Sequence, residues 1–272
     1  MSFMPTVITD DAVTLNYLEE GRGQAVVLIA GFCAPATTWM LQQKTLVANG
    51  YRVLALDRRG HGASEAPTHG ATMERHGRDV ANFLSAVGLD EAVLIGGSMG
   101  ASTIWSYVSQ FGTERVRAIV SVDQTPRMVN SAGWANGFYG LTEDNRTTFF
   151  DNGIPDTGHG RPQWKSVPSL LRLVLALRAM PKLASPDTPP MRALLADHAA
   201  QDWRATIAGI DKPYLMVAAR DSQFWPAAHA FESVDLNPLG RSVVLESCGH
   251  AANMDRPSEF NAAMLEFLDS IA

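Results

Sequence analysis

The chain has 272 residues, of which 46% are hydrophobic and 18% are charged, and its formal net charge is −6. This balance predicts one large globular domain and excludes a basic surface for nucleic acid or for an anionic membrane. The first residues, MSFMPTVITDDAV, lack the pattern of a signal peptide, and no apolar run approaches the roughly 20 residues of a spanning helix. The only two cysteines, Cys33 and Cys248, cannot form a disulfide framework, so we expect both to be reduced in a cytoplasmic protein.

Short apolar runs alternate with helix-like segments over the first 122 residues. Residues 6–18 predict two opening strands that are separated by a turn at Asp10 and Asp11. The later runs are continuously apolar, which predicts strands covered on both faces and therefore a doubly wound, mostly parallel sheet. The expected strands are 25–30, 52–56, 92–95 and 116–122, with helices over 39–48 and 73–87 and from the turn at 96–100 through residue 111.

The alternation stops after a central strand and resumes near residue 211. Residues 124–210 are rich in glycine, proline and aromatic residues, with a helical apolar patch over 170–180. A structureless loop of this length is uncommon in a compact domain, so we predict a mostly helical cap over 124–210. Residues 1–123 and 211–272 then form the core, which closes with strands over 214–219 and 242–245 and a helix over 257–271.

A glycine-rich turn follows the strand at 92–95. Its sequence, Gly96-Gly97-Ser98-Met99-Gly100, fits the G-x-S-x-G pattern and lies between an expected strand and an expected helix. That context is typical of a nucleophile elbow, in which small residues leave room for a strained, exposed serine. We predict that Ser98 is a nucleophile, which requires a histidine base, an acid and donors for an oxyanion.

His250 is the best placed of the seven histidines. It follows the last expected strand, with Gly249 before it and two alanines after it, in a loop that precedes the closing helix. The other six histidines lie on helices or loops without a matching partner. We therefore predict His250 as the general base.

Two aspartates end strands between the serine and this histidine. Asp221 follows the strand at 214–219, and Asp123 follows the strand at 116–122. The order serine, acid, histidine holds for both. We favour Asp221, because its strand is expected nearer to His250, and keep Asp123 as the alternative acid or as a cap residue at the start of the insertion.

The oxyanion donors are expected to be backbone N–H groups. Gly31 allows the chain to bend sharply after the strand at 25–30, so that the N–H of Phe32 points towards Ser98. The second donor is the N–H of Met99, at the start of a helix whose dipole favours negative charge.

Taken together, these motifs resemble the α/β-hydrolase superfamily along nearly the whole chain. The matching features are the Gly31-Phe32 loop, the loop over 57–64 (DRRGHGAS), the serine turn, Asp221 and Gly249-His250. Within the superfamily the chain is most similar to the cofactor-free haloperoxidase and arylesterase group, which uses a Ser-Asp-His triad under a helical cap. The resemblance implies an α/β-hydrolase fold and serine hydrolase chemistry without a metal or an organic cofactor.

Two departures narrow what this resemblance implies. The oxyanion loop begins Ala30-Gly31 rather than His-Gly, and it reads Gly31-Phe32-Cys33 where perhydrolase-type members tend to have Gly-Trp-Pro. Both favour ester hydrolysis over peracid formation or halogenation. The alternatives are a cofactor-free perhydrolase or haloperoxidase, a lyase, an oxygenase, or a non-catalytic ligand receptor with the same fold.

The substrate is expected to be a small or medium, mostly uncharged carboxylic ester or lactone. The sequence shows no group of arginines or lysines that would hold a phosphate or a carboxylate. Aromatic residues of the insertion and of the strand-end loops are candidates for an apolar pocket. Those we assign to the pocket are Trp134, Phe138 and Trp225, and neither nucleic acid nor a membrane is expected as a partner.

Overall fold

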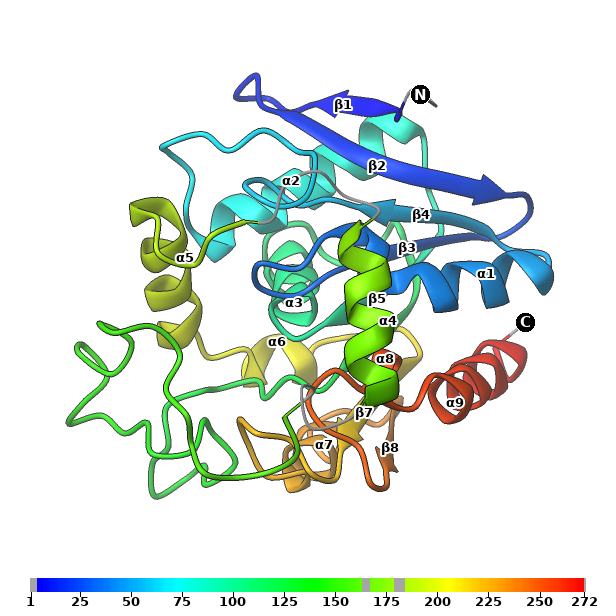
Figure 1. Cartoon of the computed structure of the whole chain (residues 1–272). Helices are drawn as coiled ribbons and strands as arrows, with labels where there is room; N and C mark the ends of the chain where they lie inside the picture. The colour runs from blue at the N-terminus through cyan, green and yellow to red at the C-terminus, as the bar shows by residue number, and fades with distance from the viewer. Residues whose placement is uncertain (1–3, 163–166, 179–183, 272) are drawn as a thin grey trace.

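A computed structural model describes residues 4–162, 167–178 and 184–271 of the chain. Its centre is an eight-stranded sheet in the order β1-β2-β4-β3-β5-β6-β7-β8 (Figure 1). β2 pairs antiparallel with β1 and β4, and all other neighbours are parallel. The strands are β1 (Thr6–Ile8), β2 (Thr14–Gly21), β3 (Ala25–Ile29), β4 (Arg52–Leu56), β5 (Ala92–Gly97), β6 (Val116–Val122), β7 (Tyr214–Ala219) and β8 (Gly240–Leu245).

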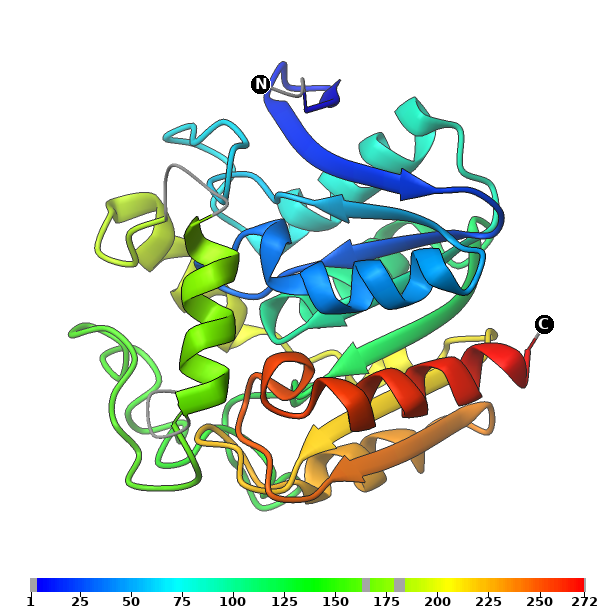
Figure 2. The same cartoon turned by 45° about the vertical axis from the view of Figure 1, so that its right-hand side comes forward.

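Helices cover both faces of the sheet, because the central strands are apolar on both sides. Figure 2 shows α1 and α9 in front of the sheet, with α2 and α3 behind it. Apolar side chains of α2, α3, α6 and α7 pack on one face, and those of α1, α8 and α9 pack on the other. These helices are α1 (Met40–Ala48, after the 3₁₀ turn η1, Ala36–Trp39), α2 (Met73–Val87), α3 (Met99–Phe111), α6 (Arg204–Ala208), α7 (Ala228–Val234), α8 (Ala252–Asp255) and α9 (Pro257–Asp269).

The sheet confirms the predicted doubly wound, mostly parallel architecture. Each expected strand is present, and β4, β6 and β7 have the expected bounds. The carboxyl ends of the parallel strands point to one side of the molecule (Figure 2). The loops after β6 lie on this side, together with the helices α4 (Val167–Arg178) and α5 (Pro189–Ala200). Functional groups that follow these strands are therefore gathered at one edge.

The insertion after β6 is less helical than expected. Residues 124–162 form turns, loops and isolated bridges without a helix or a strand. This stretch is interrupted by glycines with positive φ, such as Gly140 and Gly153, which oppose a continuous helix. Helices begin only with α4 (Val167–Arg178), which contains most of the predicted apolar patch, and continue with α5 (Pro189–Ala200). The last two residues of that patch lie outside the described residues.

The insertion has a small apolar core of its own next to the sheet. Met128, Phe138 and Leu141 are buried there, and Ala199 of α5 and Trp225 of the loop after β7 join them. Over the described residues, no helix combines the length and the apolar character that crossing a membrane requires.

Candidate active site

Ser98 lies in a sharp turn between the end of β5 and the start of α3. Its backbone has φ 52° and ψ −129°, a conformation that costs a non-glycine residue about 1–3 kcal/mol. A Cβ on Gly96 would lie 2.5 Å from the backbone nitrogen of Ala101, and one on Gly100 would lie 2.2 Å from the carbonyl oxygen of Ile29. Both glycines are thus required by close backbone contact. This geometry is the one expected of a nucleophile elbow.

His250 lies in the loop after β8 and is oriented by Asp123. Its Nδ1 is 2.7 Å from Oδ2 of Asp123, which directly follows β6. Asp123 also accepts hydrogen bonds from the backbone N–H of Ala219 (2.9 Å, to Oδ1) and from the hydroxyl of Ser222 (2.7 Å, to Oδ2). These donors help to hold the carboxylate, which contacts Nδ1 rather than Nε2 of His250.

The structure does not bring Asp221, the acid that we favoured, to the histidine. The contacts of the described residues include no hydrogen bond between the Asp221 carboxylate and His250. Asp221 instead uses its backbone: its N–H donates to Cys248, and its carbonyl accepts from Arg161. The carboxylate of Asp123, in the loop after β6, contacts Nδ1 of His250 instead. The preference for Asp221 over Asp123 is therefore reversed.

Asp123 is fully buried, yet its surroundings favour the ionised form. Burial alone would raise the pKa of this carboxyl, but His229 and His250 outweigh burial and hold the pKa below its ordinary value. An ionised Asp123 selects the tautomer of His250 that carries a proton on Nδ1, and it stabilises the imidazolium form.

The proposed oxyanion donors lie beside Ser98. Gly31 is so close that a Cβ on it would be 3.1 Å from the Cβ of Ser98. Met99 is the first residue of α3, so its N–H has no acceptor within the helix. Among the described residues, neither this N–H nor that of Phe32 has a hydrogen-bond acceptor. Both donors are therefore available to a ligand.

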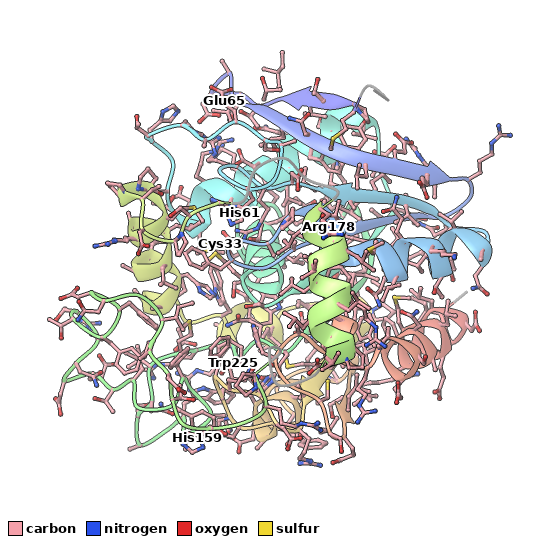
Figure 3. All side chains as sticks on the ribbon, viewed as in Figure 1. Cys33, His61, Glu65, His159, Arg178 and Trp225 are labelled. Carbon is pink, nitrogen blue, oxygen red and sulfur yellow. The ribbon has the colours of Figure 1, made fainter. Side chains whose placement is uncertain are left out.

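A buried arginine that the sequence analysis left without a role holds the oxyanion loop. Arg58 donates from Nε to the carbonyl of Ala30 (3.0 Å) and from Nη2 to the carbonyl of Gly31 (2.7 Å). Its other hydrogen-bond partners among the described side chains are the rings of His61 and His76. Burial lowers the pKa of Arg58 to about 9. His61, labelled in Figure 3, therefore supports this arginine and is separate from the candidate base. In the sequence, the only signal for Arg58 was that the whole 57–64 loop resembles the loop of the superfamily.

Two adjoining cavities reach the candidate site. The first, which we name the serine cavity, has a volume of about 280 Å³ and is lined by Ser98, Phe32, Trp39, Leu173, Met254 and His250, among others. The second, which we name the outer cavity, has a volume of about 380 Å³. Both are lined by Ile154, Phe224, His250 and Ala251.

The three aromatic residues that we assigned to the pocket lie elsewhere. Trp134 and Phe138 are buried inside the insertion, where the Trp134 indole donates to the carbonyl of Arg127. Trp225, labelled in Figure 3, packs edge-on against the His250 ring at 5.2 Å between centroids. None of the three is among the described residues that line the serine cavity or the outer cavity. Phe138 and Trp225 belong to the apolar core of the insertion, and Phe32, Trp39 and Phe224 line the serine cavity instead.

A second serine–histidine contact lies one helical turn further along α3. The hydroxyl of Ser102 is 3.0 Å from Nε2 of His198 in α5. Both side chains are buried, and Nδ1 of His198 has no hydrogen-bond partner among the described residues. Burial, followed by the charge of Arg58, lowers the pKa of His198 to about 3.

Comparison with known proteins agrees with this geometry. The family model for the alpha/beta hydrolase fold matches residues 24–257. The chain belongs to this family. The α/β hydrolase is 28% identical over 279 residues to a non-heme haloperoxidase of Rhodococcus erythropolis, covering 98% of this chain and all of the relative.

Two solved structures extend the comparison of the α/β hydrolase. A bromoperoxidase from Bacillus anthracis has a TM-score of 0.82 and 25% identity, over 98% of this chain and 100% of that one. An esterase from Exiguobacterium antarcticum has a TM-score of 0.81 over the same shares of the chains, and at 19% identity it supports the fold alone.

Proposed function

We propose that this α/β hydrolase is a serine esterase or lactonase that acts through an acyl-enzyme on Ser98. The observation that carries the proposal is the strained Ser98 turn, which opens into the same cavity as a histidine held by a buried aspartate. The catalytic residues of the proposal are Ser98, His250 and Asp123, and the N–H groups of Phe32 and Met99 are the oxyanion donors.

In the proposed mechanism, Nε2 of His250 takes the proton of the Ser98 hydroxyl as the oxygen attacks the carbonyl carbon. The ester C–O bond then breaks, and the imidazolium gives its proton to the leaving alkoxide. Water, deprotonated by His250, attacks the acyl-enzyme and releases the acid and the free serine. The structure has no direct hydrogen bond between the described side chains of Ser98 and His250, and such contacts commonly tighten only when the substrate is bound.

The two cavities suggest how an ester lies in the site. The carbonyl must lie at Ser98 and the oxyanion donors, so the serine cavity takes the acyl part. The leaving oxygen of the ester must face Nε2 of His250. Because the side chain of His250 lines both cavities, the alcohol part extends from there into the outer cavity. The described lining of the serine cavity contains no lysine, arginine, aspartate or glutamate, which favours an uncharged acyl group.

Perhydrolysis is the second candidate, and the haloperoxidase relatives favour it. It shares the acyl-enzyme, but hydrogen peroxide replaces water as the attacking nucleophile, and a peracid is released. The ratio of peracid to acid formed from one acyl donor, at rising peroxide concentration, separates the two activities.

Labelling with a fluorophosphonate followed by peptide mapping tests the nucleophile directly. We expect one modified residue, Ser98, and parallel loss of turnover of p-nitrophenyl butyrate. Labelling of Ser102, or labelling at neither serine, would overturn the proposal. Stoichiometric binding of the ester without turnover would indicate a ligand receptor instead.

A further inference from the structure

The buried carboxylate of Asp123 lies between two imidazole rings. His250 approaches Oδ2, and His229 of α7 approaches Oδ1 from the other side, with 3.5 Å between Nε2 and the oxygen. His229 is fully buried, whereas the side chain of His250 is 18% exposed. The sequence analysis gave His229 no role, and it is absent from the described lining of either cavity.

An ordinary core histidine would have its ring nitrogens satisfied by nearby groups. Within the described residues, neither ring nitrogen of His229 has a hydrogen bond of ordinary length. Its polar contact is the one with Asp123, and its ring packs edge-on against Trp225, 6.2 Å between centroids. Trp225 also packs against His250, so one indole fixes the place of both imidazoles.

We propose that His229 is a positioning residue that holds the Asp123 carboxylate in the orientation required by His250. This inference rests on the proposed function, in which His250 is the base. With a proton on Nε2, His229 directs an N–H at Oδ1, beside the N–H of Ala219. Together with the Ser222 hydroxyl at Oδ2, these donors limit rotation of the carboxylate and keep Oδ2 directed at Nδ1 of His250.

The sign of the expected pH effect follows from the orientation of the carboxylate. Without the donor at Oδ1 the carboxylate can turn away from Nδ1, so Asp123 stabilises the His250 imidazolium less. The acid limb of kcat/KM should then move to lower pH. The titratable groups that interact electrostatically with the Asp123 carboxylate are His229, His250, Tyr139 and Cys248.

His229→Leu and His229→Gln separate positioning from packing. The glutamine amide nitrogen can take the place of Nε2, whereas leucine fills the space without a donor. For His229→Leu we expect kcat to fall about tenfold to hundredfold, KM to stay within about twofold, and the acid limb to move down by about 0.5 pH unit. His229→Gln should recover most of kcat, and the exposed His69→Gln serves as the matched control.

Equal kcat values and unchanged acid limbs in the two variants would show that His229 only fills space. The ¹H NMR resonance of the His250 Nδ1 proton provides a readout that needs no turnover, and it should shift in His229→Leu and return in His229→Gln. If no ester is turned over but this resonance still responds, the proposed function fails and the positioning role stands. An unchanged resonance in both variants would overturn the positioning role itself. Should His229→Leu fail to fold, His229→Phe, which also lacks a donor, takes its place in both measurements.

Discussion

Ser98 and Ser102 lie one helical turn apart at the start of α3, and each is near a histidine in a different way. Ser98 opens into the serine cavity together with His250, whose other nitrogen bonds Asp123. Ser102 is hydrogen-bonded directly to His198, but both are closed off from solvent. His198 also lacks a carboxylate at Nδ1 within the described residues.

Under the proposed function, a serine–histidine hydrogen bond alone is not sufficient for a catalytic pair. The base must be reachable by substrate, and it needs a pKa near the working pH. Burial and Arg58 lower the pKa of His198 to about 3, so this imidazole is a weak base. At His250 an ionised carboxylate favours the imidazolium that the proposed mechanism requires.

The largest effect is expected for Ser98→Ala. Removal of the nucleophile should lower kcat for p-nitrophenyl butyrate by about 10⁵-fold to 10⁶-fold, because no acyl-enzyme can form. The measurement is initial rate, with intact-mass detection of fluorophosphonate labelling and circular dichroism to check folding. Activity within tenfold of the wild type would exclude Ser98 as the nucleophile.

Asp123→Asn should have the second largest effect. The amide cannot stabilise the imidazolium and favours the wrong tautomer of His250, so kcat should fall about 10⁴-fold. Asp221→Asn is the matched control, since the polar contacts of Asp221 with Cys248 and Arg161 are made by its backbone, and it should stay within about threefold. A greater loss in Asp221→Asn than in Asp123→Asn would restore our first choice of acid.

A smaller effect is expected on the pH dependence of stability. The pKa of His198 falls from 6.5 in the unfolded chain to about 3 in the fold. Below pH 6.5 the unfolded state therefore binds the extra proton, and the free energy of unfolding falls by about 1.4 kcal/mol per pH unit as the pH drops towards 3. The His198→Gln variant should lack this part of the pH dependence of the free energy of unfolding.

Urea denaturation at several pH values measures that slope. His61 and His76 have pKa values lowered by burial and by Arg58, so they add slopes of the same sign that remain in the variant. The quantity to compare is therefore the difference between wild type and His198→Gln, with His69→Gln as control. If the free energy of unfolding has the same pH dependence in wild type and in His198→Gln, the fold does not hold His198 neutral.

The sheet and the serine turn could be predicted because their signals are local. Continuous apolar runs specify buried parallel strands, and the glycines around Ser98 reflect backbone contacts within one turn. The place of His250 at this edge of the sheet could be predicted for the same reason, since it lies in the loop after the last strand. In each case the residues that produce the feature are neighbours in the chain.

The acid and its supports depend on side-chain contacts between loops, which the pattern of strands does not reveal. Asp123 and Asp221 both follow parallel strands, and the contact of Nδ1 of His250 with Asp123 distinguishes them. Arg58 binds backbone carbonyls, and His229 comes from α7, a helix that the sequence analysis did not predict. The cavity aromatics were misplaced because a large apolar side chain in an insertion gives the same sequence signal in a core and in a pocket.

The smallest effect on activity is expected for Ser102→Ala, and it completes the comparison. Because Ser102 and His198 are buried away from the serine cavity, kcat and KM should stay within about twofold of the wild type. Stability should fall by about 1–3 kcal/mol, since Nε2 of His198 is left buried without its partner. Initial rates and urea denaturation measure the two quantities on one preparation. Loss of hydrolysis with unchanged stability would instead place the chemistry at Ser102, and the open cavity beside Ser98 would then need another role.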